Sequence, residues 1–145
     1  MSANAPQRGS VVRYSYLWAR EHRRGQIEGL KDRPTLVLSL SIRVENNRTR
    51  ILVVPVTHAR PANPDDGVEV PAAVKRHLGL DREPAWIVTT ESNTFTWPGP
   101  DLRPIPEKPA GTFIYGQVPD GLLREVTECF IRNKERVAIV PRDET

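Results

Sequence analysis

The stretch Lys31-Asp32-Arg33-Pro34-Thr35-Leu36-Val37-Leu38-Ser39 opens with charged residues, passes one proline and continues as an apolar run. Pro34 fixes its own φ and disfavours the helical region for Arg33, so both residues should be extended. The apolar run has the composition of a buried strand. We therefore expect Arg33 at the start of a central strand, with its guanidinium free to bind a phosphate through parallel hydrogen bonds. The alternative is a surface arginine that merely precedes a strand.

The distribution of charge favours the first interpretation. Residues 1–60 hold eleven Lys and Arg against four Asp and Glu, whereas residues 61–145 hold ten against fourteen. A one-sided positive field is typical of proteins that bind a polyanion, and Arg33 lies in the basic half. An uneven but merely solvated surface is the alternative.

Length and composition limit the class of protein. The 145 residues fit one domain over 1–145, and 38% apolar with 27% charged residues is an ordinary globular composition. No apolar run approaches the roughly 18 residues of a spanning helix, so no membrane association is expected. The single cysteine, Cys129, cannot form an internal disulfide, which favours a cytoplasmic protein. One cysteine and three scattered histidines predict no metal site, and no cofactor is expected.

Hydrophobic periodicity predicts an α+β, mainly β fold: a small, strongly bent sheet or barrel of antiparallel strands with a C-terminal helix packed on it. After a disordered lead at residues 1–8, we expect strands at 10–19, 33–43, 51–57, 68–70, 85–90 and 111–117, helices at 71–79 and 119–135, a basic loop at 20–32, a turn at 45–48 and a proline-rich loop at 97–110. Residues 137–140 are predicted as a short strand or a docked tail. The first three strands should form an antiparallel meander, with Pro55 at an edge or a bulge.

This order brings two side chains together. Arg33 begins one strand and Thr57 ends the next, and in an antiparallel pair the start of one strand lies beside the end of its neighbour. A guanidinium beside a hydroxyl makes a small anion site, because both are donors to phosphate oxygens. His58 and His22 are the candidates for proton transfer near neutral pH.

The aromatic residues Tyr14, Tyr16 and Trp18 share one face of the first predicted strand. They could be a stacking platform for bases or one wall of the core. Trp18 adjoins the basic loop and is the one expected to be exposed. Together with that loop it gives the candidate residues for binding a polyanion, which become RNA-binding candidates through the family resemblance described next: Trp18, Arg20, His22, Arg23, Arg24 and Lys31.

Three segments in order, Gly9-x-Val-Val, Arg33-Pro34-x-Leu-Val-Leu-Ser39 and Ile51-Leu-Val-Val-Pro-Val-Thr57, resemble the MazF/PemK (Kid) toxins of bacterial toxin–antitoxin systems. The resemblance implies an SH3-like barrel that forms a homodimer, a metal-independent endoribonuclease that cuts single-stranded RNA, and a cognate antitoxin protein that occludes the groove. It assigns catalytic roles to Arg33 and Thr57, and a gating role to the loop at 20–32. An acidic position found in some members falls near Glu91, which joins His58 and His22 as a candidate for proton transfer.

Two departures from the family pattern bear on function. His58 stands where the family more often has a small polar residue, and residues 97–110 are unusually rich in proline. Two other functions are therefore considered. One is a CcdB-like barrel toxin that binds a protein such as DNA gyrase through its C-terminal end, and the other is a catalytically silent module that binds RNA or protein.

Overall fold

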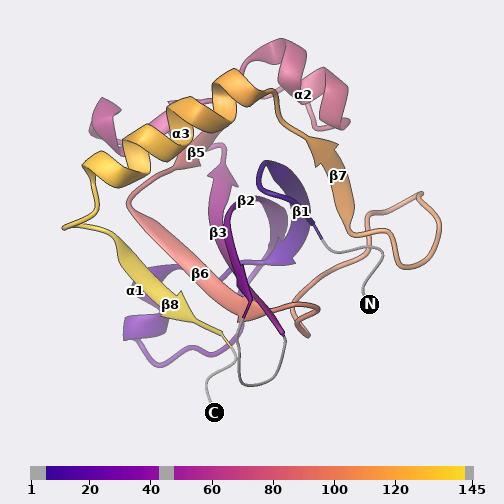
Figure 1. The fold of residues 1–145 in the computed structure, drawn as a ribbon, viewed down its shortest axis with the longest axis horizontal. Coiled ribbons are helices and arrows are strands. Elements are labelled where there is room, and N and C mark those ends of the chain that lie inside the picture. Colours follow the sequence, from indigo (N-terminus) through magenta and orange to yellow (C-terminus); the bar gives the residue numbers. More distant parts are fainter. Residues whose placement is uncertain (1–5, 43–47, 143–145) are drawn as a thin grey trace.

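The protein is described by a computed structural model that places residues 6–42 and 48–142 (Figure 1). Its strands are β1 (Ser10–Ser15), β2 (Asp32–Ile42), β3 (Thr49–Thr57), β4 (Gly67–Glu69), β5 (Trp86–Val88), β6 (Glu91–Thr96), β7 (Ile114–Gln117) and β8 (Ala138–Pro141). Its helices are α1 (Ala19–Arg23), the 3-10 turn η1 (Pro64–Asp66), α2 (Ala72–Leu78) and α3 (Asp120–Arg132). The α+β, mainly β class with a C-terminal helix packed on the sheet is confirmed.

Strands β1, β2 and β3 form the expected antiparallel meander at the centre of an eight-stranded sheet. The order β4-β5-β3-β2-β1-β7 is open, and among the described residues no ladder joins β4 to β7. On its other side β3 pairs with β6 as far as Val53 and with β5 from Val56 onward. Pro55 lies between these two ladders, at a point where the strand pairing does not require an N–H donor from this residue. The expected barrel therefore takes the form of an open, curved sheet.

Both faces of the meander are buried. Val11, Leu36 and Val54 belong to one core with α2 and α3, whereas their neighbours Val12 and Val37 belong to a second core on the opposite face. The register of β2 against β3 shifts by one residue between Val37 and Ser39. A bulge there, and not at Pro55, is what lets Leu40 pair with Ile51 and pack against the second core.

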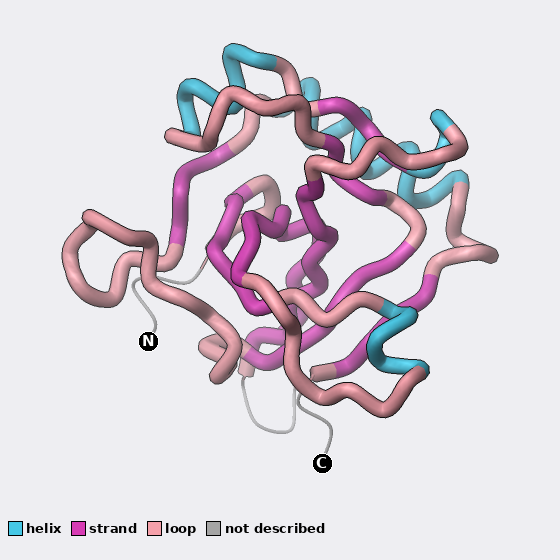
Figure 2. The backbone as a smooth tube through the Cα atoms, turned by 180° about the vertical axis from the view of Figure 1, so that it is seen from behind, coloured by secondary structure: helices cyan, strands magenta, loops and turns pink. Residues whose placement is uncertain are grey.

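The two longer helices cover one end of the sheet, and α1 lies at the other (Figure 2). Helix α3 buries the stripe Leu122, Val126 and Cys129 against the first core. Helix α2 begins after Pro71 and ends at Gly79, whose φ of 72° is the left-handed conformation that closes a helix. Both helices match the sequence-based expectation in type and position.

Several local expectations are corrected. The first strand ends at Ser15 and not at residue 19, and residues 19–23 form helix α1 where a loop was expected. Residues 91–96 form β6, which the sequence did not predict, and β8 is a strand that pairs in parallel with it. Arg8 is held by hydrogen bonds from its side chain to the Leu38 carbonyl and Thr127. Residues 1–5 of the expected disordered lead, and residues 45–47 of the expected turn, lie outside the described residues.

Candidate functional site

Arg33 and Thr57 lie together, as the strand order predicts. The β2–β3 register pairs Thr35 with Pro55 and, continued by two residues, sets Arg33 opposite Thr57. Arg33 Nη1 donates a hydrogen bond to the Val56 carbonyl at 3.4 Å, which ties the guanidinium to the end of β3. Thr57 Oγ1 accepts from the Ala59 N–H at 3.1 Å, so its hydroxyl proton is left to donate to a ligand.

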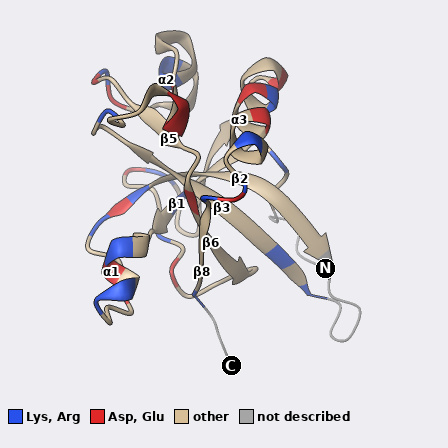
Figure 3. Cartoon of the chain, turned by 90° about the vertical axis from the view of Figure 1, so that its left-hand side faces the viewer, with Lys and Arg blue, Asp and Glu red and all other residues tan. Residues whose placement is uncertain are grey.

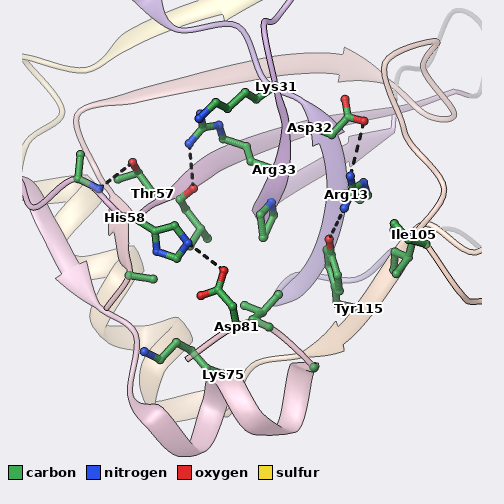
Figure 4. A pocket seen from close by; sticks show the side chains of 17 residues that line it. Arg13, Lys31, Asp32, Arg33, Thr57, His58, Lys75, Asp81, Ile105 and Tyr115 are labelled. Carbon is green, nitrogen blue, oxygen red and sulfur yellow. Dashed lines mark hydrogen bonds and ion pairs between the residues drawn. The ribbon is translucent and has the colours of Figure 1, made fainter. Parts of the chain in front are cut away.

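Both side chains line a pocket of about 600 Å³ (Figure 4). Its walls come from the ends of β2 and β3, from the turn between α2 and β5, and from β7 with the proline-rich loop. A cavity of this size is within the range that binds small ligands, roughly 300–1,000 Å³. The expected anion site is therefore one part of a larger hollow.

Positive charge predominates in the pocket. Arg13, Lys31, Arg33 and Lys75 line it against two carboxylates, those of Asp32 and Asp81. Asp32 is paired with Arg13 at 3.8 Å and with Arg103 at 3.5 Å, and Asp81 is paired with His58. Lys75 is buried and donates only to the backbone carbonyls of residues 82 and 83, at 3.3 and 2.7 Å. Among the described residues, Lys31, Arg33 and Lys75 thus form no ion pair with a carboxylate, although Glu21 attracts Arg33 electrostatically at longer range. The lining keeps an excess of positive charge, which attracts anions.

His58 connects two walls of the pocket. Its Nδ1 lies 2.8 Å from the Pro84 carbonyl oxygen and its Nε2 lies 3.0 Å from Asp81 Oδ2. Both partners are acceptors, so both ring nitrogens carry a proton when both bonds form. The bond to the Pro84 carbonyl and the Asp81 carboxylate raise the pKa of His58 against a smaller opposing effect of burial. In this arrangement neither ring nitrogen is free to accept a proton.

On its other side, Arg33 is held by an aromatic ring. The guanidinium carbons of Arg33 and Arg20 each lie 5.1 Å from the centre of the Trp18 ring, which is half-buried rather than exposed as expected. Burial lowers the pKa of Arg33, and its Nε is buried with no hydrogen-bond partner among the described residues. A cation stacked on a ring keeps its N–H edge directed outward, where a phosphate can meet it.

Glu91 lies outside the pocket. Its Oε1 accepts hydrogen bonds from the Tyr16 hydroxyl at 3.1 Å and from the Ala19 N–H at 2.8 Å. Burial raises the pKa of Glu91. The carboxylate fixes the corner between β1 and α1, and does not line the pocket that holds Arg33 and Thr57. Tyr14 and Tyr16 are buried in the second core, so they form a core wall and not a stacking platform.

The remaining candidates form a basic surface around α1, shown in Figure 3. Arg20, His22 and Arg23 belong to α1 and Arg24 follows it; all four are exposed. None of them lines the pocket, whereas Lys31, at the end of the same segment, does. The segment therefore contributes one residue to the pocket and a separate exposed patch beside it.

Several pocket residues were not singled out from the sequence: Arg13, Lys75, Asp81, Ile105 and Tyr115. Lys75 carried a detectable signal, because it follows Val74 on the apolar side of a predicted helix, where a lysine is unusual. Arg13 lies on the alternating strand between two buried residues. Asp81 and Tyr115 reach the pocket only through the tertiary arrangement of the α2–β5 turn and β7.

Comparisons of the chain with protein-family models, curated proteins and solved structures find no match. Within residues 6–42 and 48–142, no three His, Cys, Asp or Glu side chains are grouped so as to hold a metal ion. No helix in the same ranges has both the length and the apolar character needed to cross a membrane.

Proposed function

We propose that this protein is an endoribonuclease that cleaves single-stranded RNA, acting as the toxin of a toxin–antitoxin pair. The observation that carries the proposal is the placement of Arg33 beside Thr57 at a pocket where three lining cations form no ion pair within residues 6–42 and 48–142. The resemblance of residues 9–58 to the MazF/PemK toxins assigns catalytic roles to the same two residues.

The proposed reaction uses the RNA's own 2′-hydroxyl. Its oxygen attacks the adjacent phosphorus, a new O–P bond forms, and the bond to the 5′-oxygen of the next nucleotide breaks. The products are a 2′,3′-cyclic phosphate and a 5′-hydroxyl. Arg33 stabilises the charge that develops on the phosphoryl oxygens, and Thr57 donates to the same phosphate. The half-buried position of Arg33 strengthens this effect, because water screens it less.

The 2′-hydroxyl must lose a proton and the leaving oxygen must gain one. Of the three candidates, only His58 lines the pocket; Glu91 is bonded to the Ala19 N–H at the start of α1, and His22 is exposed on α1. To accept a proton, His58 would first release one of its two ring hydrogens, breaking the bond to Asp81 or Pro84. We therefore assign His58 to proton transfer through its pair with Asp81.

The test is incubation of the purified protein with a long single-stranded RNA in EDTA. Discrete cuts with cyclic phosphate ends are expected. Arg33→Met keeps the packing against Trp18 but removes the charge, and should slow cleavage about a hundredfold or more. Arg124→Met removes an equivalent charge from the exposed face of α3 and is the matched control. Equal rates for Arg33→Met and the parent would refute the catalytic role of Arg33.

A second candidate, a module that binds RNA without cutting it, is favoured by one observation: both ring nitrogens of His58 are already bonded. This candidate predicts binding that weakens steeply with salt and RNA that stays intact. A gyrase-binding tail is less favoured, because residues 138–141 pair with β6 as strand β8 and the side chain of the next residue, Arg142, is buried.

The homodimer and the antitoxin are parts of the same proposal and rest on the resemblance, whereas a cytoplasmic location rests on the single cysteine, Cys129. Light scattering at micromolar concentration measures the dimer directly. Growth arrest on induced expression, relieved by a co-expressed acidic partner protein, supports a toxin, and unaffected growth would count against one.

A further inference from the structure

The pocket extends well beyond the anion site. Arg33, Thr57 and Lys31 occupy one part, and the wall opposite is formed by Tyr115, Ile105, Arg13 and Asp32 (Figure 4). One phosphate group does not fill a cavity of about 600 Å³. The far wall must therefore meet another part of whatever ligand places a phosphate at Arg33.

The chemistry of this wall suits a flat ring. Tyr115 is half-buried on β7, and Ile105 with Pro106 adds apolar surface from the proline-rich loop. The Tyr115 hydroxyl accepts a hydrogen bond from Arg13 Nη1 at 3.3 Å, which fixes the phenol ring in place. An ordered aromatic ring beside apolar side chains is a surface on which nucleobases pack, worth about 1–3 kcal/mol per base.

Two polar groups lie beside that surface: the guanidinium of Arg13, which donates hydrogen bonds, and the carboxylate of Asp32, which accepts them. Arg13 Nη2 lies 3.8 Å from Asp32 Oδ2 and Arg103 Nε lies 3.5 Å from Asp32 Oδ1, both long separations for an ion pair. Arg13 Nε is buried without a hydrogen-bond partner among the described residues. Guanine has the complementary pattern, because O6 and N7 accept from a guanidinium while its ring and exocyclic N–H groups donate to a carboxylate. No other RNA base has this combination of acceptors and donors.

We propose that Arg13, Asp32, Tyr115 and Ile105 form a nucleobase subsite that selects guanine next to the phosphate held by Arg33 and Thr57. The inference rests on the proposed function, since it assumes that the anion at Arg33 is a phosphate of RNA. It assigns a specificity role to residues on β1, β2, β7 and the proline-rich loop, outside the Arg33–Thr57 pair.

The experiment is calorimetric titration with the 3′- and 5′-monophosphates of the four ribonucleosides and with inorganic phosphate. Either guanosine 3′-monophosphate or guanosine 5′-monophosphate should bind about tenfold more tightly than the same monophosphate of the other three nucleosides. Whether it is the 3′- or the 5′-monophosphate shows on which side of the scissile phosphate the base lies. Arg13→Met should remove the preference for guanine, measured as the ratio of its affinity to the affinities of the other three nucleotides. Tyr115→Leu should weaken the binding of all four nucleotides relative to that of inorganic phosphate. Arg124→Met should leave all of these affinities unchanged.

The outcomes separate the two proposals. Equal binding of all four nucleotides and inorganic phosphate would overturn the base subsite and leave the phosphate site in place. A preference for another base, or a guanine preference that survives Arg13→Met, would overturn the assignment of guanine to Arg13 and Asp32. If neither nucleotides nor phosphate bind, the proposed function fails as well. Thermal unfolding shows that each variant is folded, and Tyr115→Leu keeps the proposal testable if Arg13→Met is not.

Discussion

Asn93, on β6, holds the corner of the chain from which Trp18 reaches Arg33. It is fully buried, its Oδ1 accepts from the Leu17 N–H at 2.9 Å, and its Nδ2 donates to the Leu17 carbonyl at 2.8 Å. Arg142 Nη1 donates to the same Oδ1 at 3.1 Å. Asn93 thus satisfies both backbone groups of a residue that belongs to neither β1 nor α1.

Replacing Asn93 by alanine should destabilise the protein strongly. The change leaves the N–H and C=O of Leu17, a residue only 2% exposed, without partners. Each unsatisfied buried group costs about 1–3 kcal/mol, so the free energy of unfolding should fall by roughly 2–6 kcal/mol. That is a large part of the 5–15 kcal/mol that is typical of a whole domain. At about 3 °C per kcal/mol, the melting temperature should fall by roughly 6–18 °C.

The assay is urea unfolding followed by circular dichroism, with comparison of midpoints at equal slopes. The matched control is Asn63→Ala, which removes an exposed asparagine whose side chain accepts one hydrogen bond, from the Asp65 N–H. Loss of such a cap costs about 1 kcal/mol. If Asn93→Ala costs no more than Asn63→Ala, then Asn93 is not a clamp on Leu17 and the reasoning is refuted.

Three further predictions concern the surroundings of Arg33. Trp18→Leu removes the ring that holds Arg33 and should lower the cleavage rate of the proposed nuclease about fivefold, equivalent to ~1 kcal/mol. Trp18→Phe should restore part of the rate, and an unchanged rate in Trp18→Leu contradicts the positioning role. Because the pKa of His58 is raised on folding, its stabilisation is complete below the ordinary value of 6.5 and is lost as pH rises through the raised value. The side chain is 50% exposed, so the effect is at most about 1 kcal/mol, and urea unfolding of the parent and His58→Ala at pH 5.5 and 8.5 should show it in the parent alone. Burial raises the pKa of Glu91 above 4.5, so ionisation of this carboxyl lowers the stability of the fold as pH rises through the shifted value. The stability of Glu91→Gln minus that of the parent should therefore be larger at pH 7 than at pH 4. A difference that does not vary with pH contradicts this.

The parts of the fold that the sequence predicted are those with local signals. Pro34 and the apolar run after it define β2, and Pro71 with Gly79 delimits α2. Two consecutive apolar strands with a short connection pair antiparallel, and this pairing alone predicts that Arg33 lies beside Thr57. Each of these inferences uses residues close together in the chain.

Strand β6 illustrates what local signals leave out. Among its residues Glu91-Ser92-Asn93-Thr94-Phe95-Thr96 only Phe95 is apolar, so alternation of apolar and polar residues does not identify the strand. Its polar residues are buried because distant groups satisfy them: Asn93 binds Leu17, and Ser92 binds the Ala138 carbonyl. Such partners are 76 and 46 residues away and cannot be inferred from spacing. The resemblance made Glu91 a candidate for proton transfer, but its Oε1 is bonded to the Tyr16 hydroxyl and the Ala19 N–H and it does not line the pocket.

Two kinds of contact hold Arg33 in place: one follows from strand pairing near it in the chain, and the other depends on distant residues. Among the described residues its guanidinium makes one hydrogen bond, from Nη1 to the Val56 carbonyl, and rests on the Trp18 ring. An arginine has five N–H donors, and a stacked ring restricts its rotation without using any of them. The contact with Val56 follows from the strand pairing that the sequence predicts, whereas the contact with Trp18 depends on Glu91 and Asn93 holding the β1–α1 corner from β6. Substitutions on β6 should therefore change the orientation of Arg33 without altering any residue of the pocket. If the proposed nuclease activity holds, Glu91 should affect the cleavage rate by this route alone.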